Sequence, residues 1–296
     1  MKTLTLHRLD LGSEAQAADC LTSIDPRSAL LTATDLSATR GDGVFETVVV
    51  VDGVPQALDA HLDRFERSAA MLDLPAPRRD LWRLAVLAAA DELREHTARG
   101  AVKFVMSRGD EAGEAAVPVP TGWAIGFAPD SRPGGTTPEV DVVLLDRGYR
   151  HDVAQTSPWL LQGAKTLSYA VNMAALREAR RRGAQDVIFV SSDGYVLEGP
   201  NSTVIARIGG VYVTPPAELG VLPGTTQADV FSALSSGGDP VETRVIDVAE
   251  LRAADAVWLC SSTRGAAPVR SLDGTPVPVD ANATDRMNDA LNERTA

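Results

Sequence analysis

Gly163-Ala164-Lys165-Thr166-Leu167-Ser168-Tyr169 is the stretch from which the rest of the chain is interpreted. It places one lysine between a turn of small residues and an apolar helical pattern. We expect that helix to run from about residue 168 to 182, where basic residues and Gly183 mark its end. Taken alone, Lys165 is typical of a solvated lysine at a helix start, because lysine side chains are mostly exposed. Its interpretation therefore depends on the segments around it.

A second segment, Glu198-Gly199-Pro200-Asn201-Ser202-Thr203, follows 33 residues after Lys165. A lysine amine held in a partly dry pocket can lose its proton and form a Schiff base with a carbonyl group. A carboxylate nearby can keep the nitrogen of a pyridine ring protonated. Lys165 and Glu198 together therefore suggest pyridoxal 5'-phosphate as a cofactor.

Two further segments are candidates for binding the phosphate of such a cofactor. In Leu222-Pro223-Gly224-Thr225-Thr226 a glycine and two hydroxyl residues precede a helical pattern, and a helix start offers free N–H groups to an anion. The alternative is a capping box formed by Thr226 and Asp229. In His61-Leu62-Asp63-Arg64 the arginine could grip phosphate oxygens with two N–H groups, and the alternative is a surface arginine.

The composition excludes several classes of protein. The chain has 296 residues, 44% hydrophobic and 23% charged, which is long enough for two ordinary domains. A net charge of −12 would repel a phosphate backbone, so we expect no nucleic-acid partner. No apolar run approaches the roughly 20 residues that cross a bilayer, and the amino terminus lacks the apolar core of a secretory signal. We therefore expect no membrane role and a cytoplasmic location.

The four histidines and two cysteines are scattered without ligand spacing, so we expect neither a metal site nor a disulfide framework.

Helical and strand patterns alternate along the chain. We expect strands at residues 44–51, 102–107, 123–128, 140–145, 186–190, 203–208, 211–213, 241–246 and 256–260, with a hairpin turn at Asp52-Gly53. Further helices are expected at residues 58–74, 80–97, from about 225, and at 285–292.

Taken in order, these segments resemble the class IV, or fold-type IV, pyridoxal-phosphate enzymes. That group includes D-amino-acid and branched-chain aminotransferases and aminodeoxychorismate lyases. The resemblance covers nearly the whole chain. It is carried by Arg40-Gly41-Asp42-Gly43-Val44-Phe45-Glu46-Thr47, His61-Leu62-Asp63-Arg64, Gly163-Ala164-Lys165, Asp193-Gly194-Tyr195-Val196-Leu197-Glu198-Gly199 with Asn201-Ser202-Thr203-Val204, and Leu222-Pro223-Gly224-Thr225-Thr226.

The resemblance implies that Lys165 carries the covalent link to the cofactor and that Glu198 pairs with the pyridinium nitrogen. It implies a phosphate site made of Arg64, Thr225 and Thr226, with Ser261 and Ser262 as a second hydroxyl contact. Gln227 stands where many relatives carry arginine, which leaves its role open.

Arg108, in Ser107-Arg108-Gly109-Asp110, is a candidate for binding a substrate carboxylate, and a turn-capping arginine is the alternative. The fold implied is α/β with mixed α+β sheets, the cofactor lying between two domains. We expect a smaller domain at residues 1–130, a linker at 131–138 and a larger domain at 139–296 that holds the lysine. A homodimer is expected because family members commonly form one.

The resemblance implies a small-molecule amino substrate whose proton is taken by the freed Lys165 amine. The opening Gly41-Asp42-Gly43-Val44-Phe45-Glu46-Thr47 looks more like that of a deoxychorismate lyase than the branched-chain form, in which glycine follows Phe-Glu. We therefore expect an aminodeoxychorismate lyase that releases 4-aminobenzoate and pyruvate. The alternatives are an aminotransferase acting on D-alanine or a branched-chain amino acid with 2-oxoglutarate, and a catalytically silent binding protein on the same scaffold.

Overall fold

The computed structural model describes residues 2–112, 118–128 and 137–294. The chain forms two compact units. The first lies within Met1–Ser131 and Ala164–Tyr169, and the second within Arg132–Gly163 and Ala170–Arg294. Most of the expected linker, residues 131–138, falls outside the described residues. The short segment that contains Lys165 packs with the first unit, whereas the sequence analysis placed it in the second domain.

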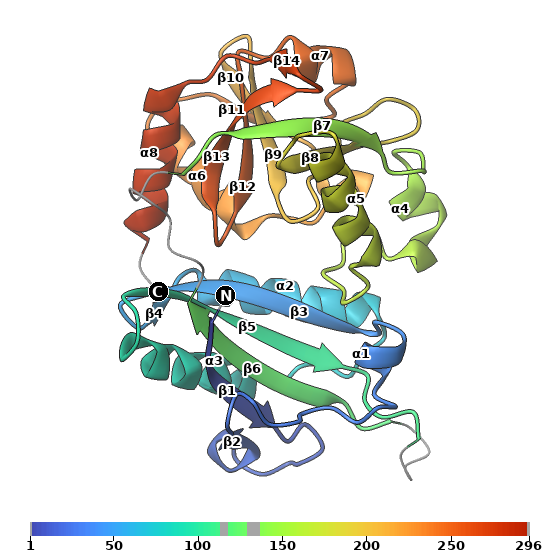
Figure 1. The fold of residues 1–296 in the computed structure, drawn as a ribbon, viewed down its shortest axis with the longest axis vertical. Coiled ribbons are helices and arrows are strands. Elements are labelled where there is room, and N and C mark those ends of the chain that lie inside the picture. The colour runs from blue at the N-terminus through green and yellow to red at the C-terminus, as the bar shows by residue number, and fades with distance from the viewer. Residues whose placement is uncertain (1, 113–117, 129–136, 295–296) are drawn as a thin grey trace. The chain divides into compact units, whose positions relative to one another are not determined.

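The first unit is built on an antiparallel sheet of six described strands in the order β2-β1-β6-β5-β3-β4 (Figure 1). The strands are β1 (Lys2–Leu9), β2 (Leu21–Ser23), β3 (Gly43–Val51), β4 (Val54–Pro55), β5 (Arg99–Ser107) and β6 (Thr121–Ala128). Asp52 and Gly53 both have positive φ, 48° and 82°, which suits the tight turn between β3 and β4. The predicted hairpin is confirmed.

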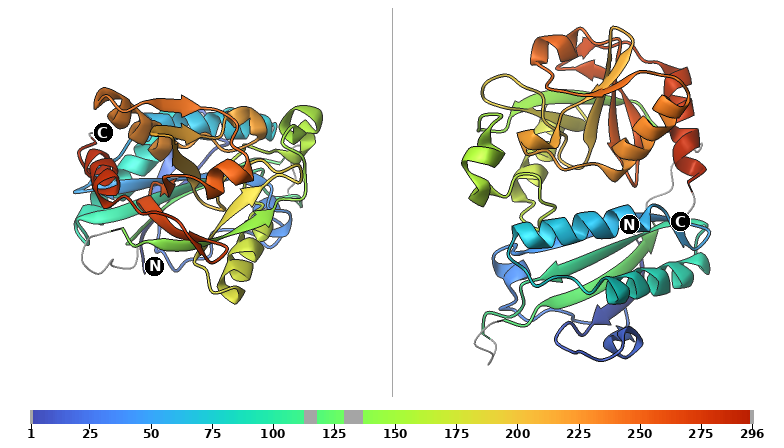
Figure 2. Two further views of the ribbon diagram at one scale, coloured as in Figure 1. Left: turned by 90° about the horizontal axis from the view of Figure 1, so that it is seen from above. Right: turned by 180° about the vertical axis from the view of Figure 1, so that it is seen from behind.

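Two helices, α2 (Leu58–Met71) and α3 (Arg79–Arg94), lie on one face of this sheet, nearest the viewer in the right-hand view of Figure 2. Their apolar residues recur every three or four positions, so each helix buries one stripe. Phe65 of α2 and Trp82 of α3 approach each other and Phe104 of β5, with ring centroids 4.9 to 5.9 Å apart. This aromatic cluster holds α2 in place above β3. The helix α1 (Leu36–Thr39) and the 3-10 helix η1 (Ala17–Cys20) are shorter.

The second unit is built on a mixed sheet with the order β11-β10-β9-β12-β13-β7-β8, and β14 pairs with β13. The β7–β8, β7–β13 and β10–β11 pairs are parallel. The strands are β7 (Val140–Asp146), β8 (Asp186–Val190), β9 (Thr203–Ile208), β10 (Val211–Thr214), β11 (Val241–Thr243), β12 (Ala256–Ser261), β13 (Gly265–Leu272) and β14 (Thr275–Pro276).

The helices of the second unit cover its sheet in separate places. They are α4 (Val153–Thr156), α5 (Ala170–Arg181), α6 (Thr225–Ser236), α7 (Val248–Arg252) and α8 (Ala281–Asn292), with 3-10 helices η2 (Pro158–Leu160) and η3 (Ala217–Leu219). α6 and α8 pack together, and Trp258 of β12 is buried with Met287 of α8. α5 buries Ala179 in a cluster with Val187 and Phe189 of β8. In the part of the chain described, no helix is both long and apolar enough to cross a membrane.

Candidate active site

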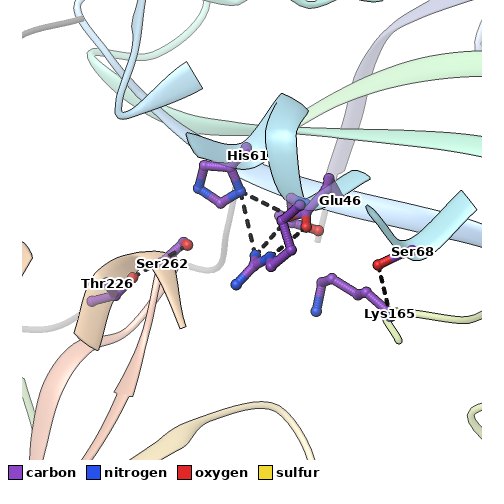
Figure 3. Close-up of polar contacts among 8 residues, drawn as sticks. Glu46, His61, Ser68, Lys165, Thr226 and Ser262 are labelled. Atoms are coloured by element: carbon purple, nitrogen blue, oxygen red, sulfur yellow. Dashed lines mark hydrogen bonds and ion pairs between the residues drawn. The ribbon is translucent and has the colours of Figure 1, made fainter. Parts of the chain in front are cut away.

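Lys165 lies in a segment that runs antiparallel to the start of β3. The N–H of Phe45 donates to the carbonyl of Lys165 over 3.1 Å, and the N–H of Leu167 donates to the carbonyl of Gly43 over 2.9 Å. The N–H of Lys165 donates to Oγ of Ser68 on α2 over 3.1 Å (Figure 3). The backbone of Lys165 is therefore fixed by a strand ladder and by α2, and the following helix, α5, begins only at Ala170.

Gly43 makes this close approach possible. A Cβ at this position would lie 2.5 Å from the carbonyl oxygen of Met106 and 2.8 Å from Cδ1 of Leu167. These distances are shorter than real Cβ contacts allow. The glycine that opens β3 is therefore required by the backbone of β5, and it also leaves room for the side chain of Leu167 in the lysine segment.

The amine of Lys165 lies over an aromatic ring that it shares with a second lysine. Nζ of Lys165 is 4.6 Å from the centroid of Phe45, and Nζ of Lys103 is 4.4 Å from the same centroid. Burial lowers the pKa of Lys103. Both amines therefore lie within cation–π range of the same aromatic ring.

Glu46 forms a buried cluster with His61 and Arg64. Alternate residues of β3 point toward α2, and Glu46 is fully buried among them. Nε of Arg64 donates to Oε1 of Glu46 over 2.6 Å, and Nη2 donates to Oε2 over 2.8 Å. Nδ1 of His61 lies 2.8 Å from Oε2 of the same carboxylate (Figure 3). Arg64 is thus buried, and the surface-arginine interpretation is wrong.

The protonation states of this cluster follow from its geometry. Burial by itself would raise the pKa of Glu46, but the charge of Arg64 and the contact with His61 outweigh it and hold that pKa well below its usual value. Burial lowers the pKa of His61 in spite of the Glu46 carboxylate. An ionised Glu46 and a neutral His61 mean that Nδ1 of His61 carries the hydrogen and donates it to Glu46.

Arg108 is held by the protein itself. Its Nε and Nη2 donate to the carboxylate of Asp42 over 2.7 and 3.2 Å. Nη2 also donates to the carbonyl of Leu72 over 2.5 Å and Nη1 to that of Asp73 over 3.2 Å, just beyond the end of α2. Four of its five N–H donors are therefore engaged. These contacts match the capping alternative, and the substrate-carboxylate role stays a prediction.

Glu198 belongs to the second unit, in the segment that follows β8. The N–H of Phe189 donates to the carbonyl of Glu198 over 2.8 Å, which pairs this segment with the end of β8. The carboxylate accepts the N–H of Leu222 over 3.1 Å. A pocket of the same unit is lined by Arg147, Tyr149, Asn172, Phe189, Leu197, Glu198, Gly220 and Val221. Glu198 is therefore one of the residues that line this pocket.

Arg147 contributes an unusual group to this pocket. It follows β7, and its Nε donates to the hydroxyl of Tyr149 over 3.0 Å. Its Nη1 is buried and has no hydrogen-bond partner. Buried polar atoms are nearly always paired, so an orphan of this kind in a pocket indicates a missing acceptor.

The helix α6 begins at Thr225, with Gly224 as its N-cap and no side chain capping it. The capping-box interpretation of Thr226 and Asp229 is therefore wrong, and Asp229 instead pairs with Arg294 over 2.7 Å. Oγ1 of Thr226 lies 3.3 Å from Oγ of Ser262 (Figure 3). A Cβ on Gly224 would lie 2.3 Å from Oγ1 of Thr203, so only glycine fits.

The structure thus brings the predicted residues together in two sets. Lys165, Arg64 and Arg108 belong to the first unit, and Glu198, Thr225, Thr226, Ser261 and Ser262 to the second. Ser261 ends β12 and Ser262 follows it. Among the described residues no group of three or more His, Cys, Asp or Glu side chains is arranged to hold a metal ion.

Comparison with known proteins shows the family of this chain. The family model for class IV amino-transferases matches residues 43–272. The chain belongs to the class IV aminotransferase family. It is therefore a pyridoxal-phosphate-dependent enzyme of fold type IV, as the sequence analysis predicted, with two mixed α/β units.

Several relatives match over most of their length. A bifunctional aminodeoxychorismate lyase / D-amino acid transaminase of Mycobacterium tuberculosis is 44% identical over 264 residues, which cover 86% of this chain and 90% of the relative. The fold IV-transaminase CpuTA1 from Curtobacterium pusillum superposes with a TM-score of 0.91 at 48% identity, covering 98% and 99% of the two chains. A PLP-bound hypothetical aminotransferase from M. tuberculosis gives a TM-score of 0.86 at 40% identity, covering 97% and 98%.

The sequence analysis missed two residues of the site. Glu46 stands at an inward position of a strand between Val44 and Val48, and a charge there needs a buried partner. Arg147 directly follows β7, and this position at the end of a strand was the only feature of the sequence that could have drawn attention to it. Neither pattern identifies the partner, because the partners lie far away in the sequence.

Proposed function

We propose that this class IV enzyme is a 4-amino-4-deoxychorismate lyase, which forms 4-aminobenzoate and pyruvate. The carrying observation is the position of Thr47. It replaces the glycine that follows Phe-Glu in branched-chain enzymes, and it lies two residues from Phe45 on the same face of β3. Because the Lys165 amine lies over the Phe45 ring, position 47 is well placed to affect which substrate reaches that amine.

The residues present suit pyridoxal phosphate. The pocket of Glu198 combines a carboxylate with the unpaired, buried Nη1 of Arg147, and a ring with a protonated nitrogen and an oxygen substituent can satisfy both. For the phosphate we propose Arg64, Thr225, Thr226, Ser261 and Ser262. The start of α6 supplies N–H groups and hydroxyls, and Arg64 supplies a charge whose orientation Glu46 fixes.

When bound, the cofactor supplies an electron-withdrawing ring that makes the substrate C–H bond next to the amine acidic. Lys165 would hold the cofactor through its Nζ, and the same amine, once free, would accept that proton as a general base. Glu198 would pair with the ring nitrogen, because a carboxylate beside that nitrogen favours its protonated form. In the lyase, expulsion of pyruvate leaves an aromatic product, and aromatisation drives the step.

The second candidate is a D-amino-acid or branched-chain aminotransferase that uses 2-oxoglutarate. The name of the M. tuberculosis relative couples a lyase with a D-amino acid transaminase, and at 44% identity it supports either activity here. An aminotransferase would pass the amino group of its substrate to an oxo acid, so the two activities leave different products.

Two assays on one preparation test the proposal. A lyase converts 4-amino-4-deoxychorismate to equal amounts of 4-aminobenzoate and pyruvate without any oxo acid. An aminotransferase shows bleaching of the visible cofactor band by D-alanine or a branched-chain amino acid, and 2-oxoglutarate restores the band. Fast bleaching without any aromatic product rejects the lyase and leaves the family assignment intact.

We also propose that the enzyme is a cytoplasmic homodimer, as members of this family commonly are. Light scattering on the purified holoenzyme tests the dimer, and a monomer mass contradicts it.

A further inference from the structure

We propose that Asp186 and Arg264 are positioning residues of the cofactor site. Their ion pair fixes the turn that carries Ser261 and Ser262 relative to the segment that carries Glu198. The inference rests on the proposed function, because it takes the two serines as contacts of the cofactor phosphate. Neither the sequence motifs nor the resemblance assigns a role to Asp186 or Arg264.

The turn that follows β12 is held on two sides. Ser261 ends β12, and its carbonyl accepts the N–H of Arg264 over 3.2 Å. On one side of the turn, Oγ of Ser262 lies 3.3 Å from Oγ1 of Thr226 at the start of α6 (Figure 3). On the other side, Nη1 of Arg264 forms an ion pair with Oδ2 of Asp186 over 2.7 Å. The side chain of Arg264 therefore links the turn to the first residue of β8.

Asp186 is itself fixed at the start of β8. It is buried, and its Oδ1 accepts the N–H of Val187 over 2.8 Å. The same strand holds the segment of Glu198, whose carbonyl accepts the N–H of Phe189 over 2.8 Å. Gly199 packs so closely on β8 that a Cβ there would lie 3.0 Å from the carbonyl oxygen of Val187. Asp186 and Glu198 therefore share β8 as a common base.

Stability alone does not explain this ion pair. Asp186 is 4% exposed, and the side chain of Arg264 is 23% exposed. Taking two charges out of water costs about as much as their attraction returns, and apolar side chains of similar size often stabilise a protein equally well. A hydrogen-bonded ion pair differs from an apolar contact because it restricts the distance and the angle between its atoms. It is therefore suited to holding a turn in one place.

The place of the turn matters because the cofactor is rigid. Pyridoxal phosphate is a flat ring with its phosphate on a short side arm, so its two binding ends lie a nearly fixed distance apart. In the proposed site the ring nitrogen pairs with Glu198, and the serine hydroxyls donate to the phosphate. Such hydrogen bonds form only at about 2.5–3.0 Å, so a displacement of the turn by about 1 Å would break them.

The test measures how much the phosphate contributes to cofactor binding. Apo-protein is titrated with pyridoxal phosphate and with pyridoxal, which lacks the phosphate, and the ratio of the two dissociation constants is the phosphate preference. The main variant is Asp186→Asn/Arg264→Met, which removes both charges and keeps an oxygen for the N–H of Val187. We expect the preference to fall about threefold to tenfold, which corresponds to the loss of one hydrogen bond. The melting temperature of the apo-protein should stay close to that of the wild type, because no buried charge is left without its partner.

The single variants Asp186→Asn and Arg264→Met complete a double-mutant cycle. If the two residues act through their ion pair, each single variant should lower the phosphate preference as much as the double variant does. Asp141→Asn/Arg270→Met removes an ion pair between β7 and β13 of the same sheet. It is the matched control and should leave the phosphate preference unchanged.

Two results overturn the inference. The first is an unchanged phosphate preference in the double variant, even where both ligands bind more weakly, because a purely structural pair affects both equally. The second is a loss in Arg264→Met that Asp186→Asn does not share, which would assign Arg264 to direct contact with the phosphate. If the double variant does not fold, Asp186→Asn alone gives the same comparison, and an unchanged preference in it rejects the positioning role.

Thr226→Val in the same titration separates this inference from the proposed phosphate site. If it lowers the phosphate preference while the variants of Asp186 and Arg264 do not, only the positioning role is rejected. If none of these variants lowers the preference, the phosphate does not bind at the start of α6, and the proposed site is rejected together with the inference. The lyase and aminotransferase assays do not depend on either outcome.

Discussion

The carboxylate of Glu46 takes two N–H donors of Arg64, so the plane of that guanidinium is fixed within the first unit. The alternation of β3 already indicated that residue 46 faces the core, because Val44 and Val48 do. The sequence could not indicate which cation balances Glu46. His61 and Arg64 reach it because α2 packs across β3, and that packing depends on aromatic residues from three elements.

Arg64→Ala should weaken cofactor binding about tenfold to a hundredfold, because charge-assisted bonds to the phosphate are lost. Chemistry at saturating cofactor should change much less. Titration of apo-protein measures the effect. Arg67→Ala, at an exposed position of the same helix, is the control and should bind normally. An unchanged dissociation constant in Arg64→Ala would return Arg64 to a purely structural role with Glu46.

Lys165→Ala should abolish both turnover and the covalent link to the cofactor. The chain has three lysines, Lys2, Lys103 and Lys165, so borohydride reduction followed by peptide mass mapping has three possible outcomes. We expect the label on Lys165 in the wild type and none in the variant. A label on Lys103 would instead assign the cofactor-linked lysine to β5, because the amine of Lys103 also lies over the ring of Phe45.

Glu198→Gln should keep the fold and the covalent link but lower turnover about a hundredfold, since an amide stabilises a protonated ring nitrogen poorly and the lost interaction amounts to a few kcal/mol. Steady-state kinetics with saturating cofactor measures this. Glu242→Gln, at an exposed carboxylate, controls for loss of a surface charge. Near-normal turnover in Glu198→Gln would remove the residue from the site.

At the scale of elements, most helices and strands were predictable, since period-two and period-3.6 patterns mark them clearly. Six strands match their predicted bounds or extend them by one residue: β3, β7, β8, β9, β10 and β12. The central strand β13 was missed because Pro268 argues against such a position. The structure resolves the conflict, since β13 pairs with β7 only from Val269 onward and the missing N–H of Pro268 lies outside that ladder.

Gly224→Ala should distort the start of α6, where the new Cβ would meet Oγ1 of Thr203. Overpacking of this kind costs about 1–3 kcal/mol, and cofactor binding should weaken with it because the helix start is the proposed phosphate site. Chemical denaturation and cofactor titration measure the two effects. Gly237, which ends the same helix at a φ of −80°, is the control, and Gly237→Ala should leave both unchanged. Equal behaviour of the two variants would contradict the steric argument.

At the scale of the whole molecule, the Glu46 cluster should make stability depend on pH. Because burial lowers the pKa of His61, the unfolded chain takes up a proton below about pH 6.5 that the folded protein does not, so stability falls as the pH falls. Glu46 adds a further loss below about pH 4.3, where unfolded carboxylates become protonated while the folded one stays ionised.

His61→Asn keeps an N–H donor near Glu46 but cannot titrate. Between pH 7 and 5 it should therefore lose up to about 2 kcal/mol less stability than the wild type, as measured by urea unfolding at both pH values. His96→Asn, at an exposed histidine, should follow the wild type. If the free energy of unfolding fell equally between pH 7 and 5 in His61→Asn and the wild type, His61 would be protonated in the folded protein.

The assignment of Lys165 to a unit was the least predictable feature of the fold. Local patterns place residues 164–169 beside the helix that follows them, and no periodicity reveals a ladder to a strand about 120 residues earlier. The sequence analysis recognised the lysine through its motif, but not the surface on which its backbone rests.

That ladder also protects an edge. The backbone groups of Gly43 and Phe45 that bond the lysine segment lie on the same side of β3 as the carbonyl of Val49, which accepts the N–H of Gln56 just after β4. The lysine segment and the β4 hairpin together therefore cover this edge of β3. A fragment that stops at Ser131 would leave the beginning of this β-branched strand with open donors and acceptors, the kind of template on which chains stack into aggregates. Attempts to divide this enzyme at its apparent domain boundary should therefore yield insoluble material unless residues 164–169 are supplied with the first half.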